Sequence, residues 1–368
     1  MKLEGLRVVD MSQFLPGPYL STLMADHGAD VIKVEPPGGD PGRHIGLTEN
    51  GVSIFFRNLN RGKRSVCLDM KDAPQLAAML KLCDRADVFI ESSRPGVASR
   101  LGLGFETLSA RNPRLVYCSI SAFGQTGPYR SRPAHDLAIE AMAGAVSCNL
   151  GSDNAPGNPH IPVADLSAST LALSAILMAL YRRHTTGLGD FIDMSMHDAV
   201  LASFPNVLGT TFAQKKPPDC KTERTWGGAA FYQIYATLDG RHIALGGQEP
   251  KFVRTLLTAW GREDFIPLCE RGPGPHQQVV IEHFKSVFKT KSQADWVEWF
   301  NSIDVCFAPV KNLREAFDDP HTRARDMVLI DEHGGEHVAS PIKFALEPGK
   351  ATLSIPQLGE HNREVIGS

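Results

Sequence analysis

The chain has 368 residues, of which 42% are hydrophobic and 21% charged, and its formal net charge is -3. A chain of this length exceeds the usual span of one hydrophobic core, so two domains, or a large domain with a smaller one inserted, are expected. The nearly balanced charge gives no indication of nucleic-acid or membrane binding.

Short runs rich in β-branched residues alternate with helical segments through the first third of the chain. The expected strands are LRVVDMS, ADVIKVEPP, RSVCLDM, ADVFIES and RLVYCSIS, and the expected helices span residues 19–27 and 74–85. This alternation predicts βαβ units and a parallel sheet, with ligands bound at the carboxyl ends of the strands. The loops after Asp10, Glu35, Glu91 and Ser121 are therefore expected to surround one cleft.

The remainder of the chain changes character twice. Residues 133–204 have a mainly helical pattern, and YQIYATLDGRHIALGG predicts a β-hairpin that turns at Asp239 and Gly240. Helices rich in Trp and Phe follow. We expect an α/β fold with a large domain over 1–205, a smaller α+β domain over 225–310, and a C-terminal arm over 311–368 that returns to the large domain.

Neither the cysteines nor the apolar runs indicate secretion or a membrane. The seven cysteines are scattered and none has CxxC spacing, which disfavours a disulfide framework or a metal site and favours reduced thiols in a cytoplasm. The N-terminal segment has no apolar core of a signal peptide, and the most apolar run, Leu171 to Tyr181, is too short to span a bilayer. We interpret that run as a buried helix.

Two basic turns follow expected strands or lie between them. NRGKRS carries Arg61 and Lys63 beside a glycine, and SSRPG places Arg94 just after a strand. A solvated turn explains one such motif equally well, but two at strand ends favour a polyanionic ligand, because arginine and lysine bind phosphate oxygens. The GxxxxGK[ST] motif of P-loop proteins and the GxGxxG motif of dinucleotide-binding proteins are both absent.

Several long blocks of the chain resemble the class III CoA-transferase family, which also contains the α-methylacyl-CoA racemases. They are VVDMSQFLPGPYLSTLMADHGADVIKVEPPGGD, NLNRGKRSVCLDMK, SRPGVASRLGLGFETLSARNPRLVYCSISAFGQTGPY and DVCFAPVKNLREAFDDPHTRARDM. The resemblance covers nearly the whole chain. It implies a large α/β domain with a Rossmann-like sheet, a small domain, two interlocked chains and an acyl-CoA substrate without metal or redox cofactor. It also implies contacts of Arg61, Lys63 and Arg94 with the phosphates of coenzyme A.

The resemblance also gives roles to three acidic or titratable residues. Asp165, in IPVADLSAST, matches the carboxylate that the transferases use as nucleophile and the racemases as proton carrier; helix capping is the simpler interpretation of an aspartate there. His135 matches the second proton carrier of the racemases, and Glu249 a residue that orients that histidine. Backbone N–H groups at the start of the Asp165 helix are expected to bind the thioester oxygen.

The choice between the two chemistries remains open at this point. The block GGAAFYQIYATLDG and the modest length resemble the racemases, whereas LAIEAMAG after His135 and LSAST after Asp165 depart from them. We favour α-proton exchange by His135 and Asp165, with transfer of CoA between two carboxylic acids through Asp165 as the alternative. A non-catalytic CoA-binding protein is the third hypothesis, and the intact Asp165 argues against it.

Overall fold

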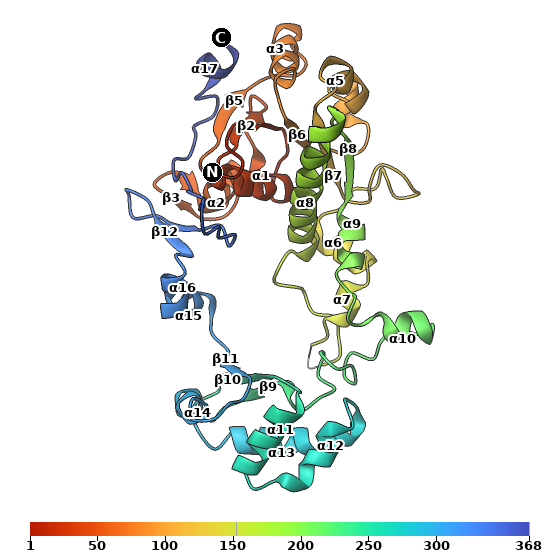
Figure 1. The fold of residues 1–368 in the computed structure, drawn as a ribbon, viewed down its shortest axis with the longest axis vertical. Coiled ribbons are helices and arrows are strands. Elements are labelled where there is room, and N and C mark those ends of the chain that lie inside the picture. Colours follow the sequence, from red (N-terminus) through yellow and green to blue (C-terminus); the bar gives the residue numbers. More distant parts are fainter. Residues whose placement is uncertain (152, 368) are drawn as a thin grey trace. The chain divides into compact units, whose positions relative to one another are not determined.

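The computed structural model describes residues 1–151 and 153–367 and divides them into two compact units (Figure 1). The first unit comprises Met1–Ser147, Asn158–Ser203 and Pro320–Ser368, and the second comprises Cys148–Gly157 and Phe204–Asp319. The predicted small domain, 225–310, lies within the second unit, which also takes in 148–157, 204–224 and 311–319. Of the predicted C-terminal arm, the part from Pro320 onwards belongs to the first unit.

A six-stranded parallel sheet forms the centre of the first unit. Its order is β5 (Arg64–Cys67), β2 (Asp30–Glu35), β1 (Arg7–Asp10), β6 (Val88–Glu91), β7 (Val116–Ser121) and β8 (Phe191–Ser195). The strand order reverses between β1 and β6, which is the point where doubly wound sheets bind ligands. The predicted parallel sheet is therefore confirmed, and its strands other than the edge strand β8 are largely buried, as such sheets require.

Helices connect these strands and cover the sheet. They are α1 (Pro16–Asp26), α2 (Ile54–Asn60), α3 (Ala73–Cys83), α4 (Val97–Arg100), α5 (Phe105–Arg111), α6 (Asp136–Met142), α7 (Ala145–Cys148), α8 (Val163–Thr186) and α9 (Met196–Ala202). Short strands β3 (Thr48–Glu49) and β4 (Val52–Ser53) pair beside α2, and the C-terminal part adds α16 (Pro320–Ala324), β12 (Val328–Ile330), β13 (Glu336–Val338) and α17 (Asn362–Ile366).

The long helix α8 packs on one side only. One side contacts β7, β8, α1 and α6, and buries Ala168, Ala172 and Ile176. Met178 and Tyr181 are 70% and 81% exposed on the other side, so the prediction of a buried helix holds for one side of α8 only. By length and composition alone α8 is also long enough to cross a membrane, a test that core helices of α/β domains pass as well.

The second unit packs helices on a three-stranded antiparallel sheet. The strands are β9 (Tyr232–Ala236), β10 (His242–Gly246) and β11 (Phe307–Pro309), and the helices are α10 (Leu208–Ala213), α11 (Pro250–Ala259), α12 (Ile266–Glu270), α13 (Gln278–Phe288), α14 (Gln293–Phe300) and α15 (Leu313–Asp318). The predicted hairpin is confirmed as β9–β10, and Gly240 takes a φ of 76° at its turn. The second unit has an aromatic core that includes Phe284, Phe288, Trp296 and Phe300.

Candidate active site

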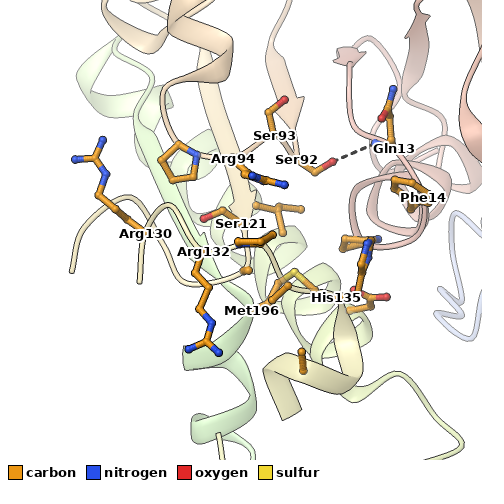
Figure 2. Close-up of a pocket in the computed structure, with 18 of the residues that line it drawn as sticks. Gln13, Phe14, Ser92, Ser93, Arg94, Ser121, Arg130, Arg132, His135 and Met196 are labelled. Atoms are coloured by element: carbon orange, nitrogen blue, oxygen red, sulfur yellow. Dashed lines mark hydrogen bonds between the residues drawn. The ribbon is translucent and has the colours of Figure 1, made fainter. Parts of the chain in front are cut away.

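The first unit contains a cavity of about 830 Å³ at the carboxyl ends of the strands (Figure 2). Its walls come from the loop after β1, the loop after β6, the end of β7 and the loop that follows it, α6, and the first turn of α8. The lining residues with polar or charged side chains are Gln13, Ser92, Ser93, Arg94, Ser121, Arg130, Arg132, His135 and Asp165. The predicted cleft at this edge of the sheet is thus present.

Asp165 lies in the first turn of α8 but does not cap the helix. Pro162 is the N-cap residue, and the first free N–H groups of α8 are bound by carboxylates of α6. The Asp165 N–H donates to Asp136 Oδ1 at 3.1 Å, and the Val163 N–H donates to Glu140 Oε1 at 2.9 Å. The capping interpretation of Asp165 is therefore wrong. We expected these N–H groups to bind the thioester oxygen, but they already donate to the carboxylates of α6.

This arrangement leaves the Asp165 carboxyl half-buried beside two other acids. Burial, with the negative charges of Asp136 and Glu140 added to it, raises the pKa of Asp165 from 3.8 to about 7. A carboxyl of this kind exchanges its proton readily near neutral pH, which is what a general acid or base requires. Asp165 is therefore suited to carry a proton.

His135 lines the same cavity as Asp165. It is the residue before α6, and its side chain makes no capping hydrogen bond to that helix. Its exposed ring meets the ring of Phe14 edge to face, with 5.9 Å between the ring centres, and Figure 2 places the two together on one side of the cavity. The structure thus brings together the histidine and the aspartate that the sequence analysis selected.

Three arginines line the cavity, of which the sequence analysis identified only Arg94. Arg130 and Arg132 lie in the loop after β7, on the side opposite His135 in Figure 2. Among the described residues none of the three guanidinium groups pairs with a carboxylate, so all are available to an anionic ligand. The signal in the sequence was GPYRSRPAH, in which two arginines precede the catalytic candidate in a loop poor in acidic residues.

Arg61 and Lys63 have a different place from the one predicted. Arg61 is 2% exposed and its guanidinium forms a two-pronged ion pair with Asp26 and a 2.9 Å bond to the Val338 carbonyl. The Lys63 ammonium donates to Asp10 at 3.2 Å and to the Asn60 side chain at 3.0 Å. Neither side chain lines the cavity, so phosphate binding by these two residues does not fit the structure.

The buried position of Lys63 has an electrostatic consequence for its partner. Burial lowers the pKa of Lys63 to about 8, against the attraction of Asp10. Burial alone would raise the pKa of Asp10, but Lys63 and Lys33 outweigh it and lower that pKa to about 2. The basic turn therefore ties α1, β1 and α2 together and leaves ligand binding to other residues.

We expect Arg61→Ala to lower the free energy of unfolding by about 3–5 kcal/mol, because it leaves the Asp26 carboxylate buried without its partner. Unfolding in urea, followed by circular dichroism, measures the loss. Arg94→Ala serves as the control, since Arg94 is exposed, and it should leave stability unchanged. Equal stability of Arg61→Ala and the unmodified protein would contradict the assigned role.

Glu249 belongs to the second unit, where it precedes α11 as its N-cap residue. Its side chain is exposed and makes no capping hydrogen bond. The described cavity residues all belong to the first unit, and contact of Glu249 with His135 stays a prediction.

Comparison with known proteins agrees with the fold. The model of CoA-transferase family III matches residues 3–362. The α-methylacyl-CoA racemase of Mus musculus is 33% identical over all of this chain and 93% of the racemase, and the acetyl-CoA:oxalate CoA-transferase of Acetobacter aceti is 32% identical over 93% of this chain and 89% of that enzyme. A crystal structure of a CAIB/BAIF family protein from Brucella suis superimposes with a TM-score of 0.85 at 30% identity, covering 99% of this chain and 98% of that one. The chain belongs to CoA-transferase family III.

Proposed function

We propose that the protein exchanges the α-proton of a 2-methylacyl-CoA and so interconverts the two configurations at the α-carbon of this substrate. The observation that carries this proposal is that His135 and Asp165 line one cavity, with the pKa of Asp165 raised to about 7 by burial and neighbouring acids. Inversion at a carbon needs two groups that each take or give a proton, and the two side chains come from different elements, α8 and the residue before α6.

The reaction uses only the groups present in the cavity and the substrate. One of the two side chains removes the α-hydrogen as a proton, and the electron pair of the C–H bond moves onto the thioester oxygen to give an enolate. The other side chain then donates a proton to the opposite face, and the C=O bond reforms. The C–S bond to CoA is never broken. Action without a metal or redox cofactor, and a cytoplasmic location, remain part of the proposal.

Arg94 is proposed to hold phosphate of the CoA moiety. A second cavity, of about 290 Å³, shares Gln13, Phe14, Ser92 and Ser93 with the first, so a long ligand can extend from one to the other along the ends of the strands. Arg94 follows Ser93 in the chain and lines the first cavity next to this shared wall. Its guanidinium suits phosphate oxygens because it presents paired N–H groups and a permanent charge.

Arg94→Ala is therefore expected to weaken CoA binding by about 1.5–3 kcal/mol, the value of a hydrogen bond to a charged group. Isothermal titration calorimetry with CoA measures this loss. Arg111→Ala is the matched control, because Arg111 lies on α5 and pairs with Asp84 outside the cavity. Unchanged affinity of Arg94→Ala would remove Arg94 from the binding site.

Transfer of CoA between two carboxylic acids is the second candidate function. It is favoured by the acetyl-CoA:oxalate CoA-transferase relative, whose identity to this chain, 32%, is close to the 33% of the racemase. In that reaction the Asp165 carboxylate attacks the thioester carbon and CoA leaves as a thiolate, which gives an aspartyl anhydride. A nucleophile must be ionised, but so must a general base, so the pKa of about 7 does not decide between the two roles of Asp165. The presence of His135 in the same cavity, which the transfer reaction does not use, favours proton exchange.

Incubation with a 2-methylacyl-CoA in deuterium oxide tests the proposal directly. A proton-exchanging enzyme must place solvent deuterium on the α-carbon while CoA stays attached, which mass spectrometry detects. Parallel incubation with an acyl-CoA and a second carboxylic acid detects transfer. Rapid formation of the second acyl-CoA without any deuterium on the α-carbon would overturn the proposal in favour of transfer.

We also propose that two chains associate, as the family resemblance implies. The exposed side of α8 carries Leu171, Leu177, Met178 and Tyr181, which are 41–81% exposed, and a second copy is proposed to cover this apolar surface. If the two chains interlock, they cannot separate without unfolding.

Dilution is therefore expected to leave the dimer intact, with no folded monomer. Mass photometry at nanomolar concentration measures the mass of the particles, and circular dichroism measures their folding. A monomer with a native spectrum at that concentration would contradict the interlocked dimer.

A further inference from the structure

Phe14, in the loop between β1 and α1, has a backbone conformation that aromatic residues rarely adopt. Its φ is 62°, in the left-handed region where a side chain crowds the backbone. Of the five described residues other than glycine with a positive φ, three are Asn or Asp, which tolerate it, and Phe14 alone is aromatic. Such a conformation costs free energy, and it persists where the surrounding structure imposes it, most often at functional sites.

The loop is held on both sides of Phe14. Before it, the Gln13 N–H donates to the Ser92 Oγ at 3.1 Å. After it, the first turn of α1 lies so close to the loop that a Cβ atom on Gly17 would be 2.0 Å from the Ser12 Oγ. These two contacts fix the path of the backbone, and with it the direction of the Phe14 side chain.

Burial in the core does not account for the position of the Phe14 ring. The side chain is 39% exposed and lines both the first and the second cavity. Its ring meets the His135 ring edge to face, with 5.9 Å between the ring centres and 83° between the planes (Figure 2). Edge-to-face contact is a favoured geometry for ring pairs. The strained loop therefore carries the Phe14 ring to one of the two proposed proton carriers.

His135 needs a partner of this kind. It precedes α6, its side chain is exposed, and it makes no capping hydrogen bond to that helix. An exposed imidazole can occupy several rotamers, whereas a general acid or base must lie within hydrogen-bond reach of the proton that it transfers. A ring packed against one side of the imidazole restricts the rotamers that it can occupy.

We propose that Phe14 is a positioning residue, whose ring holds the His135 imidazole in the orientation that exchanges a proton with the α-carbon. This inference rests on the proposed function. Phe14 forms and breaks no bond and acts only through His135. Displacement of a reacting group by about 1 Å can lower a rate by about 10²-fold, so a contact that fixes the imidazole has a large effect on proton exchange.

Three single variants test this inference. Phe14→Leu keeps an apolar side chain but removes the ring, and Phe14→Tyr keeps the ring. Phe344→Leu is the matched control, because Phe344 is also 39% exposed and meets the ring of His27 edge to face, with 5.5 Å between the centres. Neither Phe344 nor His27 lines a cavity described above.

Phe14→Leu is expected to exchange deuterium about 10²-fold more slowly than the unmodified protein. Phe14→Tyr and Phe344→Leu should exchange at close to the unmodified rate. The melting temperature of Phe14→Leu and its affinity for CoA, measured by calorimetry, should stay close to the unmodified values, because the variant keeps apolar bulk at this position. A merely structural role predicts a lower melting temperature instead.

A double variant gives the decisive comparison. In a chain that already carries His135→Ala, the further change Phe14→Leu should leave the remaining exchange rate unchanged, because no imidazole is left to position. Effects of two residues that act through one group are not additive, whereas those of independent residues are.

Nuclear magnetic resonance of isotope-labelled histidine tests the contact itself, without any reaction. The signal of the His135 ring is the one that His135→Ala removes. Phe14→Leu should shift this signal, because a neighbouring aromatic ring changes the local magnetic field, and Phe344→Leu should shift the signal of His27 instead.

The outcomes separate this inference from the proposed function. Unchanged exchange in Phe14→Leu, or an equal loss with and without His135, would overturn the positioning role. If the unmodified protein exchanges no deuterium, the proposed function fails. In that case a shifted His135 signal in Phe14→Leu still supports the contact of the two rings, and an unshifted one overturns it.

Discussion

His135→Ala is expected to slow deuterium exchange at the α-carbon by about 10²–10⁴-fold, the usual contribution of a positioned general acid or base. Affinity for CoA should be unchanged, because the exposed His135 ring makes no capping hydrogen bond to α6 that its removal would break. Mass spectrometry of the product and calorimetry with CoA give the two values. A loss of exchange without a loss of binding assigns the histidine to the chemistry.

His184→Ala provides the matched control, since His184 is an exposed histidine near the far end of α8, outside the cavity. It should exchange deuterium at the unmodified rate. The transfer mechanism predicts a different pattern: hydroxylamine should trap an activated Asp165, and His135→Ala should have little effect. An unchanged rate of exchange in His135→Ala would remove the histidine from the mechanism.

The backbone of the first unit could be predicted because its signals are local. Five of the six strands are short apolar runs, such as that of Val8 and Val9, bounded by turn residues, and helical segments were expected over 19–27 and 74–85. The sixth strand, β8 (Phe191–Ser195), was missed because it lies in the segment whose pattern is mainly helical. Alternation of this kind permits few arrangements other than a parallel sheet. The edge that carries the site follows from the same rule, so His135 and Asp165 could be selected once the family resemblance gave them roles.

The roles of Arg61 and Lys63 could not be read from the sequence, because they depend on partners far along the chain. Asp26, Val338 and Asp10 hold these two cations, and a basic turn looks the same whether its charges face a ligand or buried carboxylates. Phosphate-binding and buried cations differ only in what surrounds them. The prediction of CoA contacts from basic turns therefore included two residues, Arg61 and Lys63, that do not line the cavity.

The electrostatics of Asp165 could not be predicted either. The sequence places Asp136 and Glu140 twenty-five or more residues before it, and only the packing of α6 on α8 brings their carboxylates to the N–H groups of its turn. The same contact that satisfies the end of α8 raises the pKa of the catalytic candidate. One structural feature thus accounts for the wrong capping prediction and for the suitability of Asp165 as a proton carrier.

Asp165→Asn is expected to stop α-proton exchange and, at the same time, to make the protein more stable at neutral and alkaline pH. Because the pKa of Asp165 is raised to about 7 in the folded chain from 3.8, folding favours its neutral form. The stability due to that form is complete below about pH 4 and is lost as the pH rises to 7, by about 1.4 kcal/mol per pH unit and at most about 4 kcal/mol in all. Asparagine is neutral at every pH and avoids this loss.

Thermal unfolding of the two proteins at pH 5 and pH 8 measures the difference, which should be larger at pH 8. Asp136→Asn tests its cause, because asparagine still accepts the Asp165 N–H through its side-chain oxygen but removes a negative charge. In that variant the pKa of Asp165 should fall. For the substrate enantiomer from which Asp165 removes the proton, the exchange rate should therefore begin to rise at a lower pH. A stability difference between Asp165→Asn and the unmodified protein that is the same at pH 5 and pH 8 would show that the Asp165 carboxyl titrates outside this range, and the proton-carrier role would lose its support.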